Sequence, residues 1–114
     1  MKRIALAGLL VLSTLTDAMA GPVGGRKMSV DTVLPRDTDV YRVRCEAGKP
    51  TVAIAVAQGD IDMKVYDENG KLIDSDTDLD GTPICTWTPR WTGNFRIEII
   101  NATGRSLDYV LGIE

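Results

Sequence analysis

Residues 51–74, TVAIAVAQGDIDMKVYDENGKLID, decide the fold class because their side chains alternate with a period of two. Large apolar residues alternate with alanines over 51–57, and apolar residues alternate with mostly polar ones over 61–67. Successive side chains of a β-strand point to opposite faces, so each run predicts a strand. Asn69-Gly70 then predicts a tight hairpin turn, because both residues tolerate positive φ.

The rest of the chain continues in short alternating runs separated by turn residues, and no run has a helical period. The run 51–57 is apolar on both faces, so we expect a central strand that is covered on both sides. This pattern is typical of an all-β sandwich or barrel. The further strands that it predicts are 40–45, 71–74, 83–89, 94–100 and 106–113.

The first twenty residues have the pattern of a cleaved signal peptide. Lys2 and Arg3 precede a short apolar segment, and Ala18-Met19-Ala20 supplies the small-x-small cleavage pattern. The apolar segment is too short to cross a bilayer as a helix. We therefore predict a periplasmic or secreted protein that is not embedded in a membrane. The predicted parts are a signal peptide at 1–20, a flexible glycine-rich arm at 21–28 and one domain at 29–114.

Composition argues against several classes of function. The chain has 13 Lys and Arg against 16 Asp and Glu, a formal net charge of −3, which argues against a nucleic-acid partner. Histidine, the commonest general base near neutral pH, is absent. The sequence also has no Gly-x-Ser-x-Gly, P-loop or Cys-x-x-Cys pattern. We therefore expect no catalytic residues and no enzymatic activity.

The chain has two cysteines, Cys45 and Cys85. Strand parity places Cys45 on the same face as Val43, and Cys85 on the same face as Trp87, so both thiols should point inward. Exported proteins meet an oxidising compartment, which favours a Cys45–Cys85 disulfide between two sheets. Two free buried thiols are the alternative.

Aspartates are concentrated between residues 59 and 81. Asp76-x-Asp78-x-Asp80-Gly81 matches the first half of a calcium-binding loop, but the twelfth position is Trp87 instead of a bidentate glutamate. Alternatively, these aspartates only bond the backbone amides of their own turns. No cofactor is required by the sequence, and calcium is the candidate. Its predicted ligands are Asp60, Asp62, Asp74, Asp76, Asp78 and Asp80.

The turn TPRWTG is the other candidate site. An exposed Trp91 could stack on a sugar ring or anchor a protein partner, or it could simply cover the end of the sandwich. Trp87 lies within an alternating run, which favours a place in the core. The predicted binding residues are Arg90, Trp91, Thr92, Gly93, Asn94 and Phe95.

From Asp39 onward the sequence resembles the bacterial pre-peptidase C-terminal (PPC) type of domain. The similarity is carried, in order, by YRVRCEAGKPTVAIAV, GDIDMKVYDENGKLI, WTPRWTGNFRIEIIN and LDYVLGI. It implies a jelly-roll-like antiparallel β-sandwich of seven or eight strands. Members of this family are usually not catalytic, and some bind collagen, carbohydrate or calcium.

The chain is also similar, more distantly, to periplasmic inhibitors of g-type and i-type lysozymes. Those proteins carry a Ser-Gly-x-x-Tyr loop that enters the lysozyme cleft. The matching stretch here, Thr92-Gly93-Asn94-Phe95, is one residue shorter and has Thr for Ser and Phe for Tyr. We predict an exported non-catalytic binding module that recognises a protein or polysaccharide of the cell envelope. The alternatives are an inhibitor of lysozyme or another secreted hydrolase, and a structural envelope protein.

Overall fold

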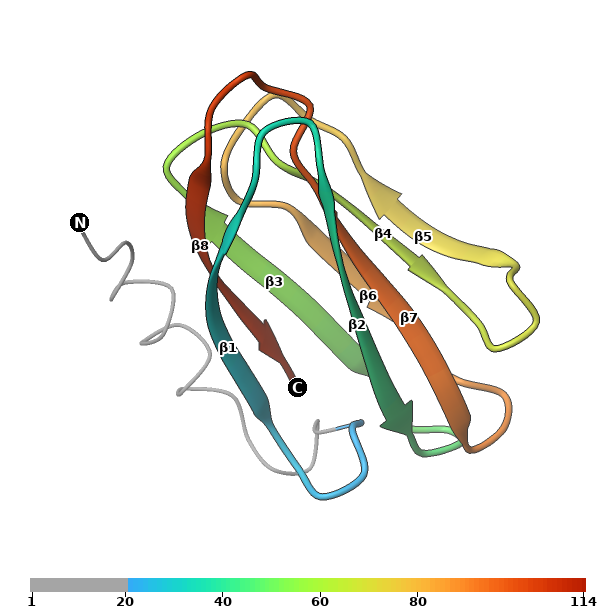
Figure 1. The fold of residues 1–114 in the computed structure, drawn as a ribbon. Coiled ribbons are helices and arrows are strands. Elements are labelled where there is room, and N and C mark those ends of the chain that lie inside the picture. The colour runs from blue at the N-terminus through green and yellow to red at the C-terminus, as the bar shows by residue number, and fades with distance from the viewer. Residues whose placement is uncertain (1–20) are drawn as a thin grey trace.

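The computed structural model describes residues 21–114, so the predicted signal peptide at 1–20 lies outside the described residues. The described chain is all-β (Figure 1). Its strands are β1 (Lys27–Val33), β2 (Thr38–Cys45), β3 (Thr51–Ala57), β4 (Asp62–Tyr66), β5 (Leu72–Asp76), β6 (Ile84–Trp87), β7 (Gly93–Ile100) and β8 (Leu107–Ile113). Within these residues no helix is long and apolar enough to span a membrane.

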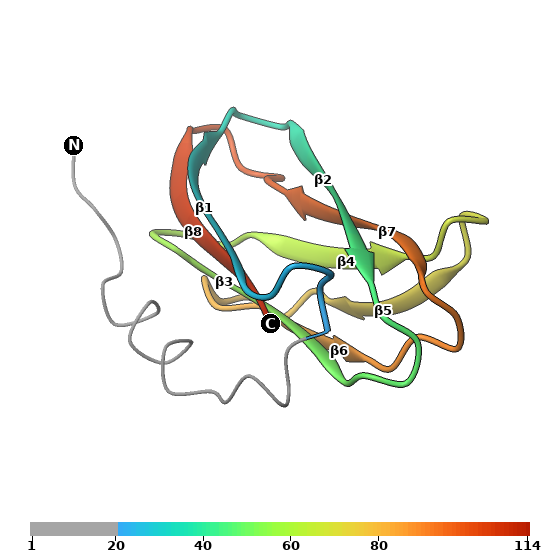
Figure 2. The ribbon, with the colours of Figure 1, turned by 90° about the horizontal axis from the view of Figure 1, so that it is seen from below.

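The strands form two four-stranded sheets, with the orders β1-β8-β3-β6 and β2-β7-β4-β5. All paired strands are antiparallel. Two such sheets with these crossovers make a jelly roll, in which consecutive strands mostly alternate between the sheets. Seen from below, β1 and β2 lie at one side of the sandwich, and β5 and β6 lie at the other (Figure 2). The structure confirms the predicted antiparallel β-sandwich.

The core lies between the two sheets and is built from the inward-facing residue of each alternating pair. Met63 and Val65 of β4 are fully buried, as are Ile97 and Ile99 of β7. Alternation along each strand therefore places one face in the core and leaves the other face towards solvent. The core also includes Val33, Val43, Phe95, Leu107, Tyr109, Leu111 and Ile113.

Strand β3 is central in its sheet, as predicted, but it is covered on one face only. Its alanines face the core, with Ala53 and Ala55 fully buried. Val52, Ile54 and Val56 form a half-buried outer face instead, so the prediction that both faces are covered is wrong. Small inner residues suit this strand because its neighbour β8 supplies the large inward side chains, Leu111 opposite Ala55 among them.

The segment expected to be a flexible arm, residues 21–28, is part of the folded domain. Gly21 and Pro22 are buried, and Pro22 forms an antiparallel bridge with Cys45. Lys27 and Met28 begin β1, which pairs with β8 along its full length. The prediction was wrong because glycine content was taken as flexibility. Gly24 and Gly25 instead adopt positive φ, of 89° and 91°, in a turn that leads into β1.

Both cysteines are buried and both are free thiols, so the predicted Cys45–Cys85 disulfide is absent. Both thiols point inward, as strand parity predicts, but they lie on opposite sides of the sandwich. Cys45 ends β2, an outer strand of one sheet, whereas Cys85 lies on β6, the outer strand on the other side of the second sheet. The Cys85 thiol contacts the Met63 carbonyl oxygen at 3.8 Å.

Three turns meet at one end of the sandwich. In the antiparallel fold, the β2–β3, β4–β5 and β6–β7 connections all leave from the same end. Gly48 N–H donates to the Pro89 carbonyl (2.8 Å), and Ala47 N–H donates to the Thr92 hydroxyl (3.0 Å), which ties the first turn to the third. This end holds the candidate site.

A candidate binding pocket at one end of the sandwich

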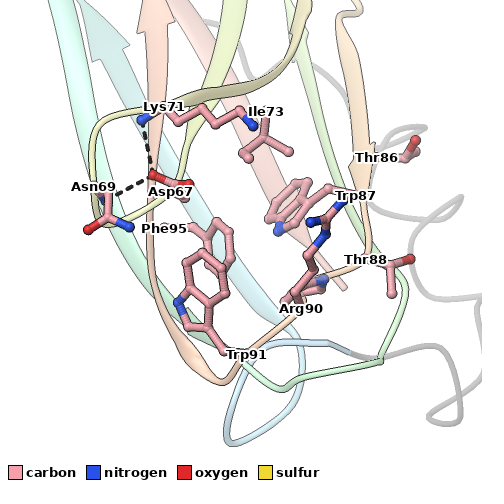
Figure 3. A pocket seen from close by; sticks show the side chains of 11 residues that line it. Asp67, Asn69, Lys71, Ile73, Thr86, Trp87, Thr88, Arg90, Trp91 and Phe95 are labelled. Carbon is pink, nitrogen blue, oxygen red and sulfur yellow. Dashed lines mark hydrogen bonds between the residues drawn. The ribbon is translucent and has the colours of Figure 1, made fainter.

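An open pocket of about 540 Å³ lies between the β4–β5 hairpin and the β6–β7 turn (Figure 3). Ligand sites of small proteins commonly fall in this range of volume. The pocket is lined by Asp67, Asn69, Lys71, Ile73, Thr86, Trp87, Thr88, Pro89, Arg90, Trp91 and Phe95.

The β4–β5 hairpin has the turn that Asn69-Gly70 predicts. Gly70 adopts a φ of 82°, and its N–H donates to the Asp67 carbonyl at 3.0 Å. The Asp67 carboxylate accepts from the amides of Asn69 (2.8 Å) and Lys71 (3.0 Å), which fixes the loop in the manner of an Asx turn. This carboxylate thereby holds one wall of the pocket in place.

Trp91 is held against the β4–β5 hairpin by Glu68. One Glu68 carboxylate oxygen accepts from Trp91 Nε1 and the other accepts from the Asn94 amide, both at 3.2 Å. Gly93 is needed beneath them, because a Cβ there would approach Trp91 Cδ1 to 2.9 Å and Glu68 Oε1 to 3.0 Å. The indole is 39% exposed, so one of its surfaces remains open to a ligand.

Trp87 forms the floor of the pocket. Its side chain is 7% exposed and packs against Phe95, with ring centroids 5.8 Å apart and planes inclined by 41°. Its buried Nε1 has no hydrogen-bond partner in the described chain. Figure 3 shows the indole beside Arg90, Ile73 and Phe95, with its nitrogen on the pocket side. Buried indole N–H groups normally have an acceptor, and this one has none among the residues that the structure describes.

The pocket combines two aromatic walls with several hydrogen-bonding groups. Lys71 and Arg90 supply cationic donors, while Thr86, Thr88 and Asn69 supply neutral polar groups. Asp67 is the one carboxylate among the described residues that line it, and that carboxylate is engaged by its own turn. Chemically, the pocket can hold a neutral or weakly anionic ligand that has both an apolar face and oxygen acceptors.

The predicted turn 90–95 contributes to the pocket with three of its six residues, Arg90, Trp91 and Phe95. The Thr92 hydroxyl accepts the Ala47 amide, and Gly93 is buried beneath Trp91. Phe95 is 4% exposed and belongs to the core. Its ring therefore does not project from the turn, unlike the residue that a protruding Ser-Gly-x-x-Tyr loop would present.

The sequence pattern did not indicate the β4–β5 side of the pocket or the buried, unpaired nitrogen of Trp87. Alternation assigns Asp67 and Lys71 to the predicted strands 61–67 and 71–74, Asn69 to the hairpin turn and Trp87 to the core. The alternation of strand direction was a usable signal, because in an antiparallel fold the β4–β5 and β6–β7 turns must share one end. Nothing in the sequence alone indicated that the indole N–H would lack a partner.

The aspartates predicted to bind calcium occupy the other end and the β5–β6 side. Asp74 and Asp76 sit at inward positions of β5, opposite buried Val65 and Met63 of β4. Asp74 Oδ2 accepts the Thr86 amide and Asp76 Oδ2 accepts the Ile84 amide, both at 2.9 Å. These are hydrogen bonds to the free edge of β6, which belongs to the opposite sheet.

Two further carboxylate oxygens of this group also accept backbone amides. Asp76 Oδ1 accepts the Asp78 amide (3.1 Å), and Asp80 Oδ1 accepts the Thr82 amide (3.0 Å). Burial raises the pKa of Asp62, and so do the neighbouring Asp60 and Asp76 charges, against the lowering effect of Lys64. Across residues 21–114, no three His, Cys, Asp or Glu side chains are grouped so as to hold a metal ion.

Comparison with known proteins places the fold but not the function. The sequence matches no protein-family model and no curated protein. Its structure is similar to the pre-peptidase C-terminal domain of a collagenase from Bacillus anthracis, with a TM-score of 0.68 and 11% identity over 78% of this chain and 89% of that one.

Periplasmic inhibitors of g-type lysozyme have the same architecture. The Aeromonas hydrophila PliG inhibitor superposes with a TM-score of 0.60 and 15% identity over 88% of this chain and 91% of that one. The Salmonella Typhimurium PliG inhibitor superposes with a TM-score of 0.53 and 14% identity over 78% of this chain and 89% of that one. The chain therefore shares its sandwich fold with a PPC domain and with lysozyme inhibitors, as the sequence resemblance predicted.

Proposed function

We propose that this protein is an exported, non-catalytic binding module that holds a glycan of the cell envelope in the pocket between the β4–β5 hairpin and the β6–β7 turn. The observation that carries the proposal is Trp87. Trp87 lines the pocket, and its buried Nε1 has no hydrogen-bond partner in the described chain. A ligand oxygen at this position would satisfy a donor that otherwise costs about 1–3 kcal/mol to leave unpaired.

A sugar ring suits the rest of the pocket. Its C–H face can pack on the exposed surface of Trp91, while its hydroxyl and ring oxygens meet the Trp87 N–H and the Arg90 and Lys71 side chains. The lining carries two cations and one carboxylate, and that carboxylate already accepts two backbone amides. The pocket therefore favours acceptor-rich ligands and leaves no free carboxylate to act as a general base, which supports a binding role over catalysis.

Intrinsic fluorescence provides a direct test, because both tryptophans of the chain line this pocket. The purified protein would be titrated with tetrasaccharides of cellulose, chitin and mannan, and with soluble peptidoglycan fragments. We expect one of these to shift the emission and to give a saturable heat of binding. If none does, the glycan proposal fails.

Two substitutions then separate the roles of the tryptophans. Trp87→Phe keeps a ring on the floor but removes the N–H, and should weaken binding about tenfold. Trp91→Ala removes the exposed wall and should weaken it at least as much. Leu79→Ala is the matched control, since Leu79 is 89% exposed and does not line the pocket. Unchanged affinity in both tryptophan variants would contradict the assignment of the site.

Inhibition of a g-type lysozyme is the second candidate function, and the observation that favours it is the shared fold of two such inhibitors. Here the exposed Arg90, Trp91 and Asn94 would contact the enzyme, because Phe95 is in the core. Size-exclusion chromatography with a g-type lysozyme, together with an activity assay, tests this. A stoichiometric complex that Trp91→Ala abolishes would support inhibition; full lysozyme activity in molar excess of this protein would contradict it.

A further inference from the structure

We propose that the groove between β1 and β2 binds an extended acidic peptide, which adds as a strand to the free edge of β2. This groove lies on the side of the sandwich away from β5 and β6, and its volume is about 630 Å³. Figure 1 shows β1 and β2 descending from the loop that joins them, with the blue turn that precedes β1 at their lower ends. The groove is lined by Val23, Arg26, Lys27, Met28, Ser29, Tyr41, Arg42, Val43, Arg44 and Ile113.

Charge is the first argument for an acidic ligand. Four cationic side chains, Arg26, Lys27, Arg42 and Arg44, line the groove, and no carboxylate of residues 21–114 does so. This is unusual in a chain whose net charge is −3. Arg26 is paired with buried Glu114 at 2.7 Å. Lys27, Arg42 and Arg44 form no ion pair or side-chain hydrogen bond within the described chain, so their charges are available to a partner.

The backbone of β2 is the second argument. Strand β2 is the outer strand of its sheet and pairs with β7 without a register shift. On its other side, Val23 N–H donates to the Arg44 carbonyl (2.7 Å) and Glu46 N–H donates to the Gly21 carbonyl (2.8 Å). In an antiparallel pair, the backbone N–H and C=O groups of every second residue point away from the partner strand. Since those of Arg44 and Glu46 point away from β7, the groups of Arg42 and Val40 also face this free edge.

The chain itself shows that a strand can be added here. Residues 21–23 already lie antiparallel to the end of β2 and form a bridge at Cys45. Gly24 and Gly25, both with positive φ, then turn the chain away before it reaches Arg42. The edge beyond Arg44 is thus left open for a second segment, and strand addition to an exposed edge is a common mode of peptide recognition.

The alternation of β2 specifies the pattern of the peptide. Arg42 and Arg44 point to the outer face, whereas Tyr41 and Val43 point inward and form the apolar floor. Side chains directly opposite one another in an antiparallel pair lie on the same face. Because Val23 already pairs with Arg44, an acidic residue of the peptide would lie opposite Arg42 and diagonal to Arg44. Small apolar residues on either side of it would pack on the floor.

Fluorescence anisotropy with labelled five-residue peptides tests both arguments on the intact protein. Glu-Val-Glu-Val-Glu should bind, whereas Lys-Val-Lys-Val-Lys should not. Residues opposite Arg42 and Val40 use their own N–H groups in pairing, so N-methylation of the glutamate amides should weaken binding at least tenfold. N-methylation of the valine amides, which point away from β2, should weaken it less than about threefold.

Protein variants locate the site. Arg42→Ala with Arg44→Ala should weaken the acidic peptide about tenfold or more, while Lys49→Ala with Lys64→Ala removes the same charge elsewhere and should have little effect. Equal losses in the two double variants, or equal effects of the two N-methylation patterns, would overturn strand addition. If dextran sulfate binds in an Arg42-dependent manner while neither unmodified peptide does, the groove is a polyanion site and the proposal is wrong.

Discussion

The two lateral sides of the sandwich differ in how the edges of the sheets are joined: the side between β5 and β6 is closed, and the side between β1 and β2 is open. Between β5 and β6, the Asp74 and Asp76 carboxylates accept amides of the opposite sheet at 2.9 Å. Between β1 and β2 no such bonds occur in the described chain beyond the segment 21–23, and cationic side chains line an open groove. An exposed strand edge can pair with another chain, and only the side between β5 and β6 has its edge protected from such pairing by side chains of the neighbouring strand.

Inward-facing charge explains the closed side. At two positions of β5 where alternation calls for apolar residues, the chain has aspartates, and their period of two matches that of the free amides on β6. The carboxylates thus occupy donors that a foreign strand would use. The open side keeps its edge accessible, as a binding groove requires.

The largest expected effect follows from breaking the closed side. Asp74→Ala with Asp76→Ala removes two charge-assisted hydrogen bonds between the sheets, and should lower the free energy of unfolding by about 3 kcal/mol. Chemical denaturation monitored by circular dichroism measures this. The freed edge of β6 should also promote association, which light scattering would detect.

Asp78→Ala is the matched control for this change. Its backbone takes part in the loop, but within residues 21–114 its side chain forms no hydrogen bond. We expect its effect on the free energy of unfolding to be within about 0.5 kcal/mol. Equal destabilisation by Asp78→Ala and by the double variant would show that the loss comes from loop charge and not from the bonds to β6.

Much of the fold could be predicted from alternation alone. The runs that contain β2, β3, β4, β7 and β8 alternate cleanly, and the Asn69-Gly70 turn fixed the β4–β5 hairpin. Strand β1 was not predicted because five of its seven residues are exposed and its alternation is weak. Its position depends on pairing with β8, which lies at the far end of the sequence.

The candidate site was only half predicted, for a related reason. Trp91 could be recognised because it lies in a turn, but its partner Glu68 is 23 residues away in sequence. Likewise, the aspartates were visible as a cluster, whereas their acceptor role depends on β6 lying beside β5. The local sequence pattern predicts where a strand lies and which of its residues point inward. It does not predict which strand edges lie side by side, because the packing of the two sheets decides that.

The open side and the closed side each contain one buried thiol, Cys45 and Cys85, and both thiols should make the free energy of unfolding depend on pH. Burial raises the pKa of Cys45 from 9.0 to about 11. Burial raises that of Cys85 to about 12, and the nearby Asp74 and Asp76 charges add to the increase. Since the folded pKa values are raised, both thiols contribute stability below pH 9, and this contribution is lost as the pH rises towards 11–12.

Between pH 8 and 9.5 the two thiols together should reduce the free energy of unfolding by about 1.5 kcal/mol. Urea titrations across this pH range should show that the free energy of unfolding falls less in the Cys45→Ala, Cys85→Ala double variant than in the parent protein. Burial also raises the pKa values of Tyr41 and Tyr109, so the free energy of unfolding of the double variant should still fall at higher pH. The same slope in parent and variant would mean that the thiols do not titrate differently on unfolding.

Calcium has the smallest expected effect, and it tests which role the aspartates have. Asp74 and Asp76 each direct a carboxylate oxygen at an amide of β6 at 2.9 Å, and Asp80 directs one at the Thr82 amide at 3.0 Å. A cation that took these oxygens would have to displace these hydrogen bonds, two of which join the sheets. Thermal melts in calcium and in chelator should therefore agree to within about 1 °C. A melting temperature that rises with calcium, and does so no longer after Asp76→Ala with Asp78→Ala, would restore the calcium site that the sequence predicted. It would also mean that the closed side of the sandwich is held by an ion as well as by its amides.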